Sequence, residues 1–268
     1  QIIKENTATM PIQYSPTQWV LAFFFYAFIG WIWEVSYVSI KEQKAQNRGF
    51  LFGPIIPIYG FGALIILLST SGVRDYWYWV FILGAVSASI LELITGLLME
   101  ALFKVRYWDY SHLRFNVRGY IAPSVSLVWG VFSLFLVYAV NPPVENLITN
   151  IVEPWDRILG LVLLLALAID TTKSVQDALD LKSLLKRYAD VEAVRESLAE
   201  RVKVLNEDIS ENLDDLRETV KHLQLSYDKM SDNAVQRARR LLKRNPHATS
   251  RHFTETLDQI KERLSKTL

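Results

Sequence analysis

Acidic side chains stand inside long apolar stretches of this sequence, where an ionised group is costly unless protein surrounds it. The sharpest case is a run of small and acidic residues at strict four-residue spacing, which places them all on one helix face: Gly84, Ala88, Glu92, Gly96 and Glu100. The small residues permit a close helix neighbour, which would press both carboxylates into the protein. Glu34 and Asp170 interrupt two further apolar stretches.

Basic residues flank these stretches and supply candidate counter-charges, namely Arg48, Lys104, Arg106, Arg114 and Arg118. They could form ion pairs with the acids or bind an anionic head group. A structural interpretation stays open beside a substrate or ion site, because buried acid–base pairs often only fix helix register. Glu100 lies close enough to the membrane interface to snorkel, so Glu92 is the strongest candidate.

The segment RGFLFGPIIPIYGFG, residues 48–62, begins an apolar stretch in an irregular way. Its prolines remove backbone donors, and its glycines allow close backbone approach. It predicts either a packed re-entry beside a cavity or a proline-capped helix start with glycines for tight packing. The structural residues of this segment are Gly49, Gly53, Pro54, Pro57, Tyr59 and Gly60.

The aromatic loop VRYWDYSHLRFNVRGYIAP, residues 105–123, has polar residues at turn positions. Asp109 is placed to bond local backbone, and Asn116 suits a second turn. Trp108 and Tyr110 are expected at the membrane interface. The loop is expected to fold back as a cap.

Apolar runs of membrane length predict about five transmembrane helices, at residues 19–40, 57–73, 77–103, 121–140 and 158–172. The first is too long for a signal-peptide core and lacks a cleavage site. The fold class is therefore an all-α polytopic membrane bundle with a helical cytoplasmic extension. The domains expected are a polar leader at 1–17, a membrane domain at 18–175 and a cytoplasmic helical domain at 176–268.

Basic residues are concentrated in the loops after the first and third spans, while the other two loops carry only Arg74 and Arg157. Both basic loops should be cytosolic. Five crossings then place the amino terminus outside the cell membrane and the carboxyl terminus in the cytoplasm.

After residue 172, apolar residues recur at steps of three and four up to Met230, which is typical of a coiled-coil seam. We expect a long helix from about Asp180 to Arg244, ended by Pro246, and then an amphipathic helix carrying Leu257 and Ile260. The second helix is expected to pair with the end of the first as a hairpin. A homodimer through the long helix is the alternative use of the seam.

Several separated motifs resemble a family of bacterial membrane proteins labelled putative ABC-transporter type IV permeases, also called CmpB-like. They are YAFIGWIWE at 26–34, RGFLFGPIIPIYGFG at 48–62 (the glycine–proline segment), LELITGLLMEALF at 91–103 and YWDYSHLRFNVRGYI at 107–121. The resemblance covers about residues 20–140 and implies a multi-span membrane protein. Matching positions add Gly30, Trp31, Ser111, Phe115 and Gly119 to the site and segment residues already named. Tyr107 and the order Arg118–Gly119 depart from the family pattern.

Composition narrows the functions further. A net charge of +1 gives no case for nucleic acid binding, and the absence of cysteine excludes thiolate chemistry. No phosphate loop G-x-x-x-x-G-K-[ST] occurs, so ATP-driven transport would need a separate ATPase subunit. No cofactor or metal site is indicated, and membrane lipids are the expected surroundings.

Three hypotheses remain. The chain is a transporter component with a cytosol-facing polar cavity, or a membrane-embedded enzyme acting on a lipid-linked or phosphorylated substrate, or a membrane-anchored coiled-coil scaffold. In the enzyme, Glu92 or Glu34 would be the base, and Arg48, Arg106 or Arg118 would bind the anion. The intramembrane acids and the aromatic loop favour the first two, with transport preferred.

Overall fold

The computed structural model describes residues 14–43, 47–151, 153–205, 218, 221–222, 225 and 240–266. These residues form helices and two isolated β-bridges, and no strand occurs among them, which confirms the predicted all-α class. The chain divides into two compact units. The first comprises Gln1–Leu98 with Trp108–Ser174, and the second Met99–Tyr107 with Val175–Leu268.

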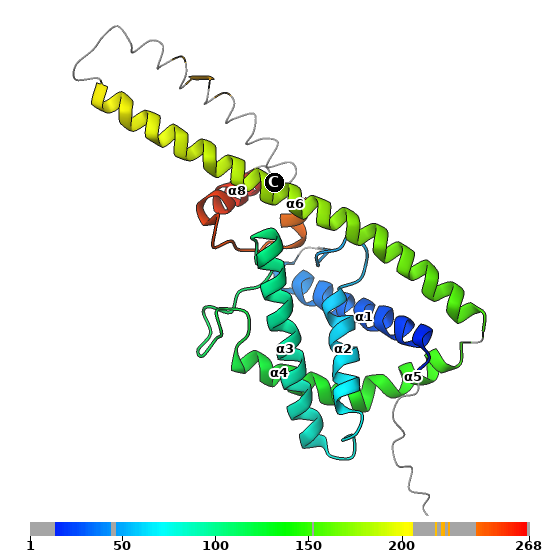
Figure 1. The fold of residues 1–268 in the computed structure, drawn as a ribbon. Coiled ribbons are helices and arrows are strands. Elements are labelled where there is room, and N and C mark those ends of the chain that lie inside the picture. The colour runs from blue at the N-terminus through cyan, green and yellow to red at the C-terminus, as the bar shows by residue number, and fades with distance from the viewer. Residues whose placement is uncertain are drawn as a thin grey trace, which may run out of the picture. The chain divides into compact units, whose positions relative to one another are not determined.

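Four helical stretches of the described chain are long and apolar enough to cross a membrane. They are α1 (Pro16–Glu42), α3 (Trp77–Phe103), the run α4–η1–α5 from Pro123 to Thr149, and α6 (Trp155–Leu205). Figure 1 shows their order along the chain. The expected span at 77–103 matches α3 in both bounds. Helix α1 begins with a capping box, in which the side chains of Ser15 and Gln18 satisfy each other's backbone amides.

The second expected span is only α2 (Pro57–Thr70), a 14-residue helix about 21 Å long at about 1.5 Å per residue. A bilayer core is about 30 Å thick, so α2 is shorter than a regular span. The preceding residues 47–56 are not helical, and the Ile56 amide donates to the Ala27 carbonyl near the middle of α1 (3.0 Å). The non-helical residues before α2 therefore contact α1 near its middle, directly before α2 begins.

Glycines also let α1 and α2 approach closely. A Cβ on Gly30 would lie 2.3 Å from the Tyr59 Cβ, and one on Gly60 would lie 2.7 Å from the Phe23 carbonyl oxygen. Gly49 has φ +108°, a conformation that other residues rarely adopt. Both sequence interpretations of the segment thus contribute, because it re-enters the bundle and its glycines allow tight packing.

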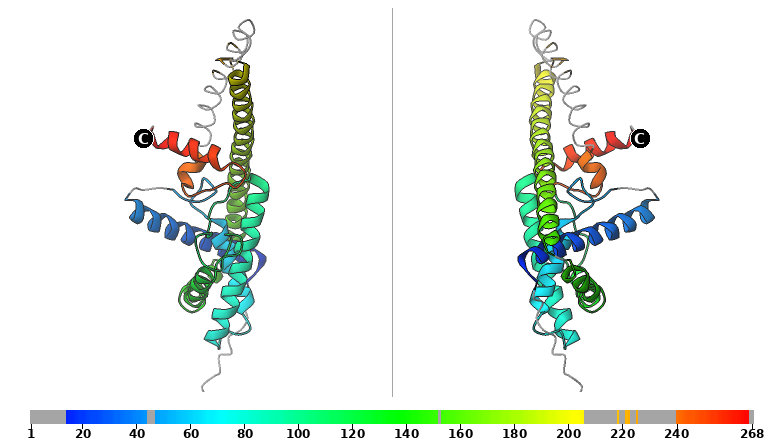
Figure 2. Two further views of the ribbon diagram at one scale, coloured as in Figure 1. Left: turned by 90° about the vertical axis from the view of Figure 1, so that its left-hand side faces the viewer. Right: turned by 90° about the vertical axis from the view of Figure 1, so that its right-hand side faces the viewer.

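The fourth span is longer than the predicted 121–140. Helix α4 (Pro123–Phe135) continues through a π-helix η1 (Leu136–Val140) into α5 (Asn141–Thr149). Pro142 and Pro143, which follow the predicted end of this span, stand in the first turn of α5, where their missing amide donors are tolerated. Figure 2 shows α4 nearly end-on, to one side of α2 and α3.

The second unit gathers the end of α3, part of α6 and the carboxyl-terminal segment. The Arg106 and Thr249 backbones exchange two hydrogen bonds (2.7 and 2.9 Å), and the Ser250 hydroxyl donates to the Lys104 carbonyl (2.7 Å). Helix α8 (Thr254–Lys266) is amphipathic, with Leu257 and Ile260 buried as predicted.

The long helix expected from about Asp180 begins earlier, because α6 runs unbroken from Trp155 to Leu205 and includes the expected fifth span. The Tyr188 hydroxyl of α6 bonds Gln259 of α8 (3.1 Å), so α8 meets α6 well before the end of the long helix. Most of the coiled-coil seam predicted beyond residue 205 lies outside the described residues.

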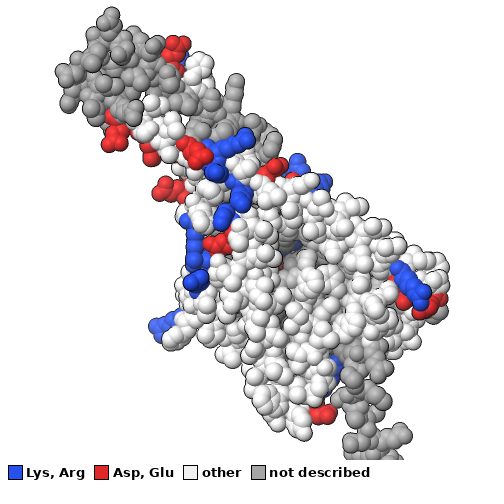
Figure 3. Space-filling model, viewed as in Figure 1, with Lys and Arg blue, Asp and Glu red and all other residues white. Residues whose placement is uncertain are grey.

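Charge is sparse on the surface of the first unit. On the face shown in Figure 3, side chains over α2, α3 and α4 are almost entirely uncharged. Large apolar side chains such as Val86, Ile94 and Val131 are more than half exposed. Such a surface suits hydrocarbon rather than water.

Candidate functional site

Glu92 lies inside the first unit and is 4% exposed. Its two carboxylate oxygens accept from the Tyr110 hydroxyl (2.9 Å) and from the Trp129 indole nitrogen (3.2 Å). Both donors are neutral, and no basic side chain of the described residues forms an ion pair with Glu92. A buried carboxyl group with only neutral donors has no counter-charge of its own, so a cation placed beside it would favour its ionised form.

The spacing that places Glu92 in the bundle behaves as predicted. All five residues of the four-residue repeat are buried. A Cβ on Gly84 would meet Ser133 of α4 at 2.1 Å, and one on Gly96 would meet Tyr120 at 2.7 Å. The small residues therefore admit the neighbours that enclose the carboxylate.

Glu34 of α1 is held by a second set of partners. It accepts from the Tyr59 hydroxyl (2.8 Å) and pairs loosely with Arg48, whose Nη2 lies 3.6 Å from the carboxylate. Asn47 fixes the start of the Arg48 segment, because its amide bonds the Trp31 indole (2.7 Å) and the Phe52 carbonyl (3.1 Å). The Glu34 side chain is 30% exposed, so it is the more accessible of the two acids.

Aromatic side chains join the two acids into one cluster. The Tyr59 and Trp129 rings lie 6.1 Å apart between centroids. Burial raises the pKa of the Tyr110 phenol, and the carboxylates of both Glu92 and Glu34 raise it further, so the hydroxyl stays a donor at neutral pH. We call this cluster the two-carboxylate site; it consists of Glu34, Arg48, Tyr59, Glu92, Tyr110 and Trp129.

The two other predicted acids, Asp170 and Glu100, have partners outside the two-carboxylate site. Asp170 of α6 accepts from the backbone amides of Phe52 (2.9 Å) and Gly53 (2.7 Å), and so satisfies donors that the irregular segment leaves free. Ser174 adds a third donor to the same carboxylate (3.2 Å). Asp170 therefore positions the segment that carries Arg48.

Glu100 pairs with Arg106 (2.5 Å), and both residues are buried in the second unit. This pair links the last turn of α3 to the chain that follows it. Of the four acids, Glu34 and Glu92 therefore share one cluster, while Asp170 and Glu100 bind other partners.

The aromatic loop folds through the turns that its sequence predicts. Asp109 accepts from the Ser111 amide (2.9 Å) and the Ser111 hydroxyl, and Asn116 accepts from the Gly119 amide (2.8 Å). These residues hold the loop rather than line the two-carboxylate site. Arg118 is exposed, with φ +51°.

The polar atoms of Trp108 and Tyr110, the loop aromatics expected at the membrane interface, form hydrogen bonds within the protein. Tyr110 bonds Glu92, and the Trp108 indole donates to the Tyr120 carbonyl (3.0 Å). The loop thus caps the bundle and contributes a donor to the site.

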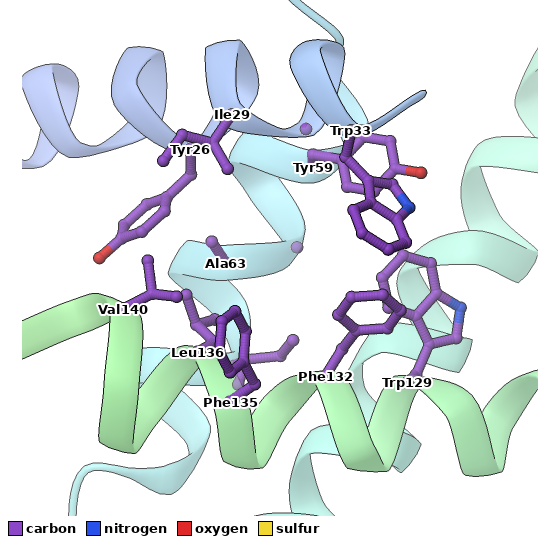
Figure 4. A pocket seen from close by; sticks show the side chains of 13 residues that line it. Tyr26, Ile29, Trp33, Tyr59, Ala63, Trp129, Phe132, Phe135, Leu136 and Val140 are labelled. Atoms are coloured by element: carbon purple, nitrogen blue, oxygen red, sulfur yellow. The ribbon is translucent and has the colours of Figure 1, made fainter. Parts of the chain in front are cut away.

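An apolar groove of about 170 Å³ adjoins the two-carboxylate site. Figure 4 shows it between α1, α2 and the α4–η1 stretch, with Ala63 of α2 at its floor. Four aromatic side chains gather at one end of the groove, namely Trp33, Tyr59, Trp129 and Phe132. Two of them also belong to the two-carboxylate site, because Tyr59 bonds Glu34 and Trp129 bonds Glu92. We call this cavity the aromatic groove.

The far end of the groove leads to a second polar group. Tyr26 lines this end, and its hydroxyl donates to Asn141 (2.9 Å), whose amide donates to Glu145 (3.1 Å). Nearby, burial and the Glu145 carboxylate raise the pKa of Tyr14 to about 12, while Arg74 opposes them. The groove therefore runs between polar side chains at both ends.

Sequence reasoning missed Trp129 and the aromatic groove. Trp129 lies in an ordinary apolar run, and its bond to Glu92 depends on how α4 packs against α3. No local signal marks it. Within the described part of the chain, no three acidic or histidine side chains are grouped so that they could hold a metal ion.

Comparison with known families places these features in context. A family model described as Putative ABC-transporter type IV matches residues 21–175, which include both acids, the glycine–proline segment and the groove. Neither the curated proteins nor the solved structures give a match. The matched residues make up more than half of the chain, and the helices are those of a multi-pass membrane protein. The chain therefore belongs to the Putative ABC-transporter type IV family.

Proposed function

We propose that this chain is the membrane-spanning component of a transporter and that its substrate contacts the two-carboxylate site. The observation that carries the proposal is Glu92, a buried carboxylate bonded only by neutral donors beside an open groove. A residue that merely fixed helix register would be expected to have a basic partner, as Glu100 has in Arg106.

The groove supports transport over catalysis. It runs beside two polar groups that lie eight residues apart on α1, at Tyr26 and at Glu34, and its walls are apolar between them. A molecule could therefore exchange one polar environment for another along a single cavity. The enzyme hypothesis needs a basic anion site at the acids. Of its three candidate arginines, Arg48 pairs with Glu34, Arg106 pairs with Glu100, and Arg118 is exposed.

A separate ATPase subunit supplies the energy in this proposal, because the chain has no phosphate loop. We expect the full chain, isolated from its native membrane in mild detergent, to co-purify with an ATPase that mass spectrometry identifies. In proteoliposomes, the complex should hydrolyse ATP faster than the ATPase alone. The ATPase mutated in its phosphate-loop lysine is the control.

Two results would contradict the proposal. The first is purification of the chain without an ATPase, while a known transporter complex prepared in parallel as a control keeps its ATPase. The second is turnover of a radiolabelled membrane lipid by the purified chain alone, which would establish the enzyme hypothesis. The mass of the complex by light scattering reports at the same time whether one or two copies of the chain are present, and hence tests the proposed homodimer.

We infer that the amino terminus lies outside and the carboxyl terminus in the cytoplasm. Lys41 stands in the last turn of α1 and Arg48 follows this helix, while Arg114 and Arg118 precede α4. The chain contains no cysteine, so single cysteines report topology without background. We expect Ser111→Cys to be shielded from a membrane-impermeant maleimide in intact cells and Ser71→Cys to react. The reverse pattern would overturn the orientation.

The proposed domains are a membrane domain at 18–175 and a cytoplasmic helical domain at 176–268. Two observations support the second: α8 is amphipathic, and polar side chains cover α6 beyond residue 175. Residues 99–107, at the end of α3, belong to the same compact unit as this second part. The two proposed domains are therefore connected through α3 as well as through α6.

A further inference from the structure

We propose that the aromatic groove binds an amphiphile with an alkylated ammonium head, which enters from the bilayer. The head would lie among the four aromatic rings beside Glu34 and Glu92, and the hydrocarbon chain would follow the groove toward Tyr26. This inference rests on the proposed function and names the class of its substrate.

The aromatic end of the groove has the composition of an ammonium site. The Trp33 and Phe132 rings lie 5.6 Å apart between centroids, and the Trp129 ring lies 6.1 Å from both Phe132 and Tyr59. Cations bind over aromatic faces within about 6 Å of a ring centroid. Rings with these separations, inclined at 50–81° to one another, allow one cation to contact several faces. Figure 4 shows the four side chains at the same end.

Charge selects a cation rather than an anion. The two-carboxylate site has two acids and only Arg48 as a basic member, and Arg48 already pairs with Glu34. The charged groups that raise the pKa of Tyr110 are both carboxylates. Two ring residues contact the acids directly, since Tyr59 bonds Glu34 and Trp129 bonds Glu92. A positive head group would therefore neutralise the excess negative charge without displacing Arg48.

The rest of the groove suits a hydrocarbon chain. Its lining past the rings is aliphatic or aromatic, with Ala63 on α2 and with Leu136 and Val140 on η1. Trp33 and Phe135 on its rim are more than half exposed on helices of membrane-spanning length. The opening therefore lies on a surface that meets acyl chains, and an amphiphile dissolved in the bilayer reaches it without crossing water.

Dodecyltrimethylammonium is the probe, and titration calorimetry of the full chain in a neutral dodecyl maltoside micelle measures its Kd. Every micelle already supplies dodecyl chains, so the measurement isolates the head group. We expect dodecyltrimethylammonium to bind at least tenfold more tightly than dodecyl sulfate or dodecanol. Tetramethylammonium, which lacks the chain, should bind at least tenfold more weakly than the probe.

A matched pair of tryptophan variants locates the site. Trp33→Ala should raise the Kd about tenfold, and Trp33→Phe should restore most of the affinity, because a face for the cation remains. Trp79→Ala is the control, since Trp79 is similarly exposed but does not line the groove. Both positions are exposed, so neither substitution opens a core cavity.

Equal binding of the cationic, anionic and neutral amphiphiles would overturn the inference, as would an unchanged Kd in Trp33→Ala. These results are distinguishable from failure of the proposed function. If the chain forms a complex with an ATPase and transports some other solute, the transport proposal stands and only the ammonium class of substrate is excluded. If the chain binds the probe selectively but has no ATPase and transports nothing, the transport proposal is excluded and the binding site stands.

Discussion

Glu92→Gln is expected to weaken binding of dodecyltrimethylammonium by at least about tenfold, or ~1.4 kcal/mol, and at the same time to raise the thermal stability of the ligand-free chain. The amide removes the negative charge that attracts the ammonium head. It also removes the cost of ionising a buried carboxyl group that has no counter-charge. The Tyr110 hydroxyl can turn to accept from the new amide nitrogen while Trp129 donates to the amide oxygen, so neither partner is left unpaired. Titration calorimetry and tryptophan-monitored melting measure the two effects on one preparation.

The opposite signs separate a binding role from a structural one. If Glu92 only fixes helix register, the substitution should lower the melting temperature and leave probe affinity unchanged in the molecules that stay folded. Glu153→Gln is the matched control, because Glu153 forms an exposed pair with Arg157 and should change neither quantity. Unchanged affinity in Glu92→Gln would remove the centre of the proposed site.

Asp170→Ala should be the most destabilising single substitution among the site residues. The carboxylate accepts from two backbone amides in a partly buried part of the chain. Hydrogen bonds to charged groups are worth about 1.5–3 kcal/mol each, so the free energy of unfolding should fall by about 3–5 kcal/mol. Unfolding in mixed micelles of increasing sodium dodecyl sulfate content measures the loss.

Asp170→Asn tests the reason for that loss. Its single amide oxygen can satisfy one of the two backbone donors, so we expect roughly half the destabilisation of Asp170→Ala. Glu153→Ala serves as the exposed acidic control. A fall in stability no larger than that of the control would show that the Phe52 and Gly53 amides have other acceptors.

Periodicity and length predicted the helices well, because a long apolar run has few alternatives in a membrane. Helix α3 matches its expected bounds, and the four-residue spacing correctly buries Glu92. The ion pairs of Glu34 with Arg48 and of Glu100 with Arg106 are among those that the sequence made available.

Failures occurred where packing overrides local signals. The sequence of residues 47–56 contains helix breakers but not the acceptor that lets an irregular backbone enter the bundle, because Asp170 lies more than a hundred residues away. The prolines after residue 140 read as a stop, yet they stand where a helix tolerates them. Trp129 and the groove arise from three elements at once, so no single stretch reveals them.

The π-helix Leu136–Val140 gives the groove a particular vulnerability. A π-turn holds one residue more than an α-turn, so it amounts to an insertion that the helix absorbs. Loss of one residue there would rotate Asn141 and Glu145 by about 100° relative to Trp129 and Phe132, since an α-helix turns once in 3.6 residues. The alignment of the two ends of the groove is therefore set by residue count in this one turn, whatever the side chains are.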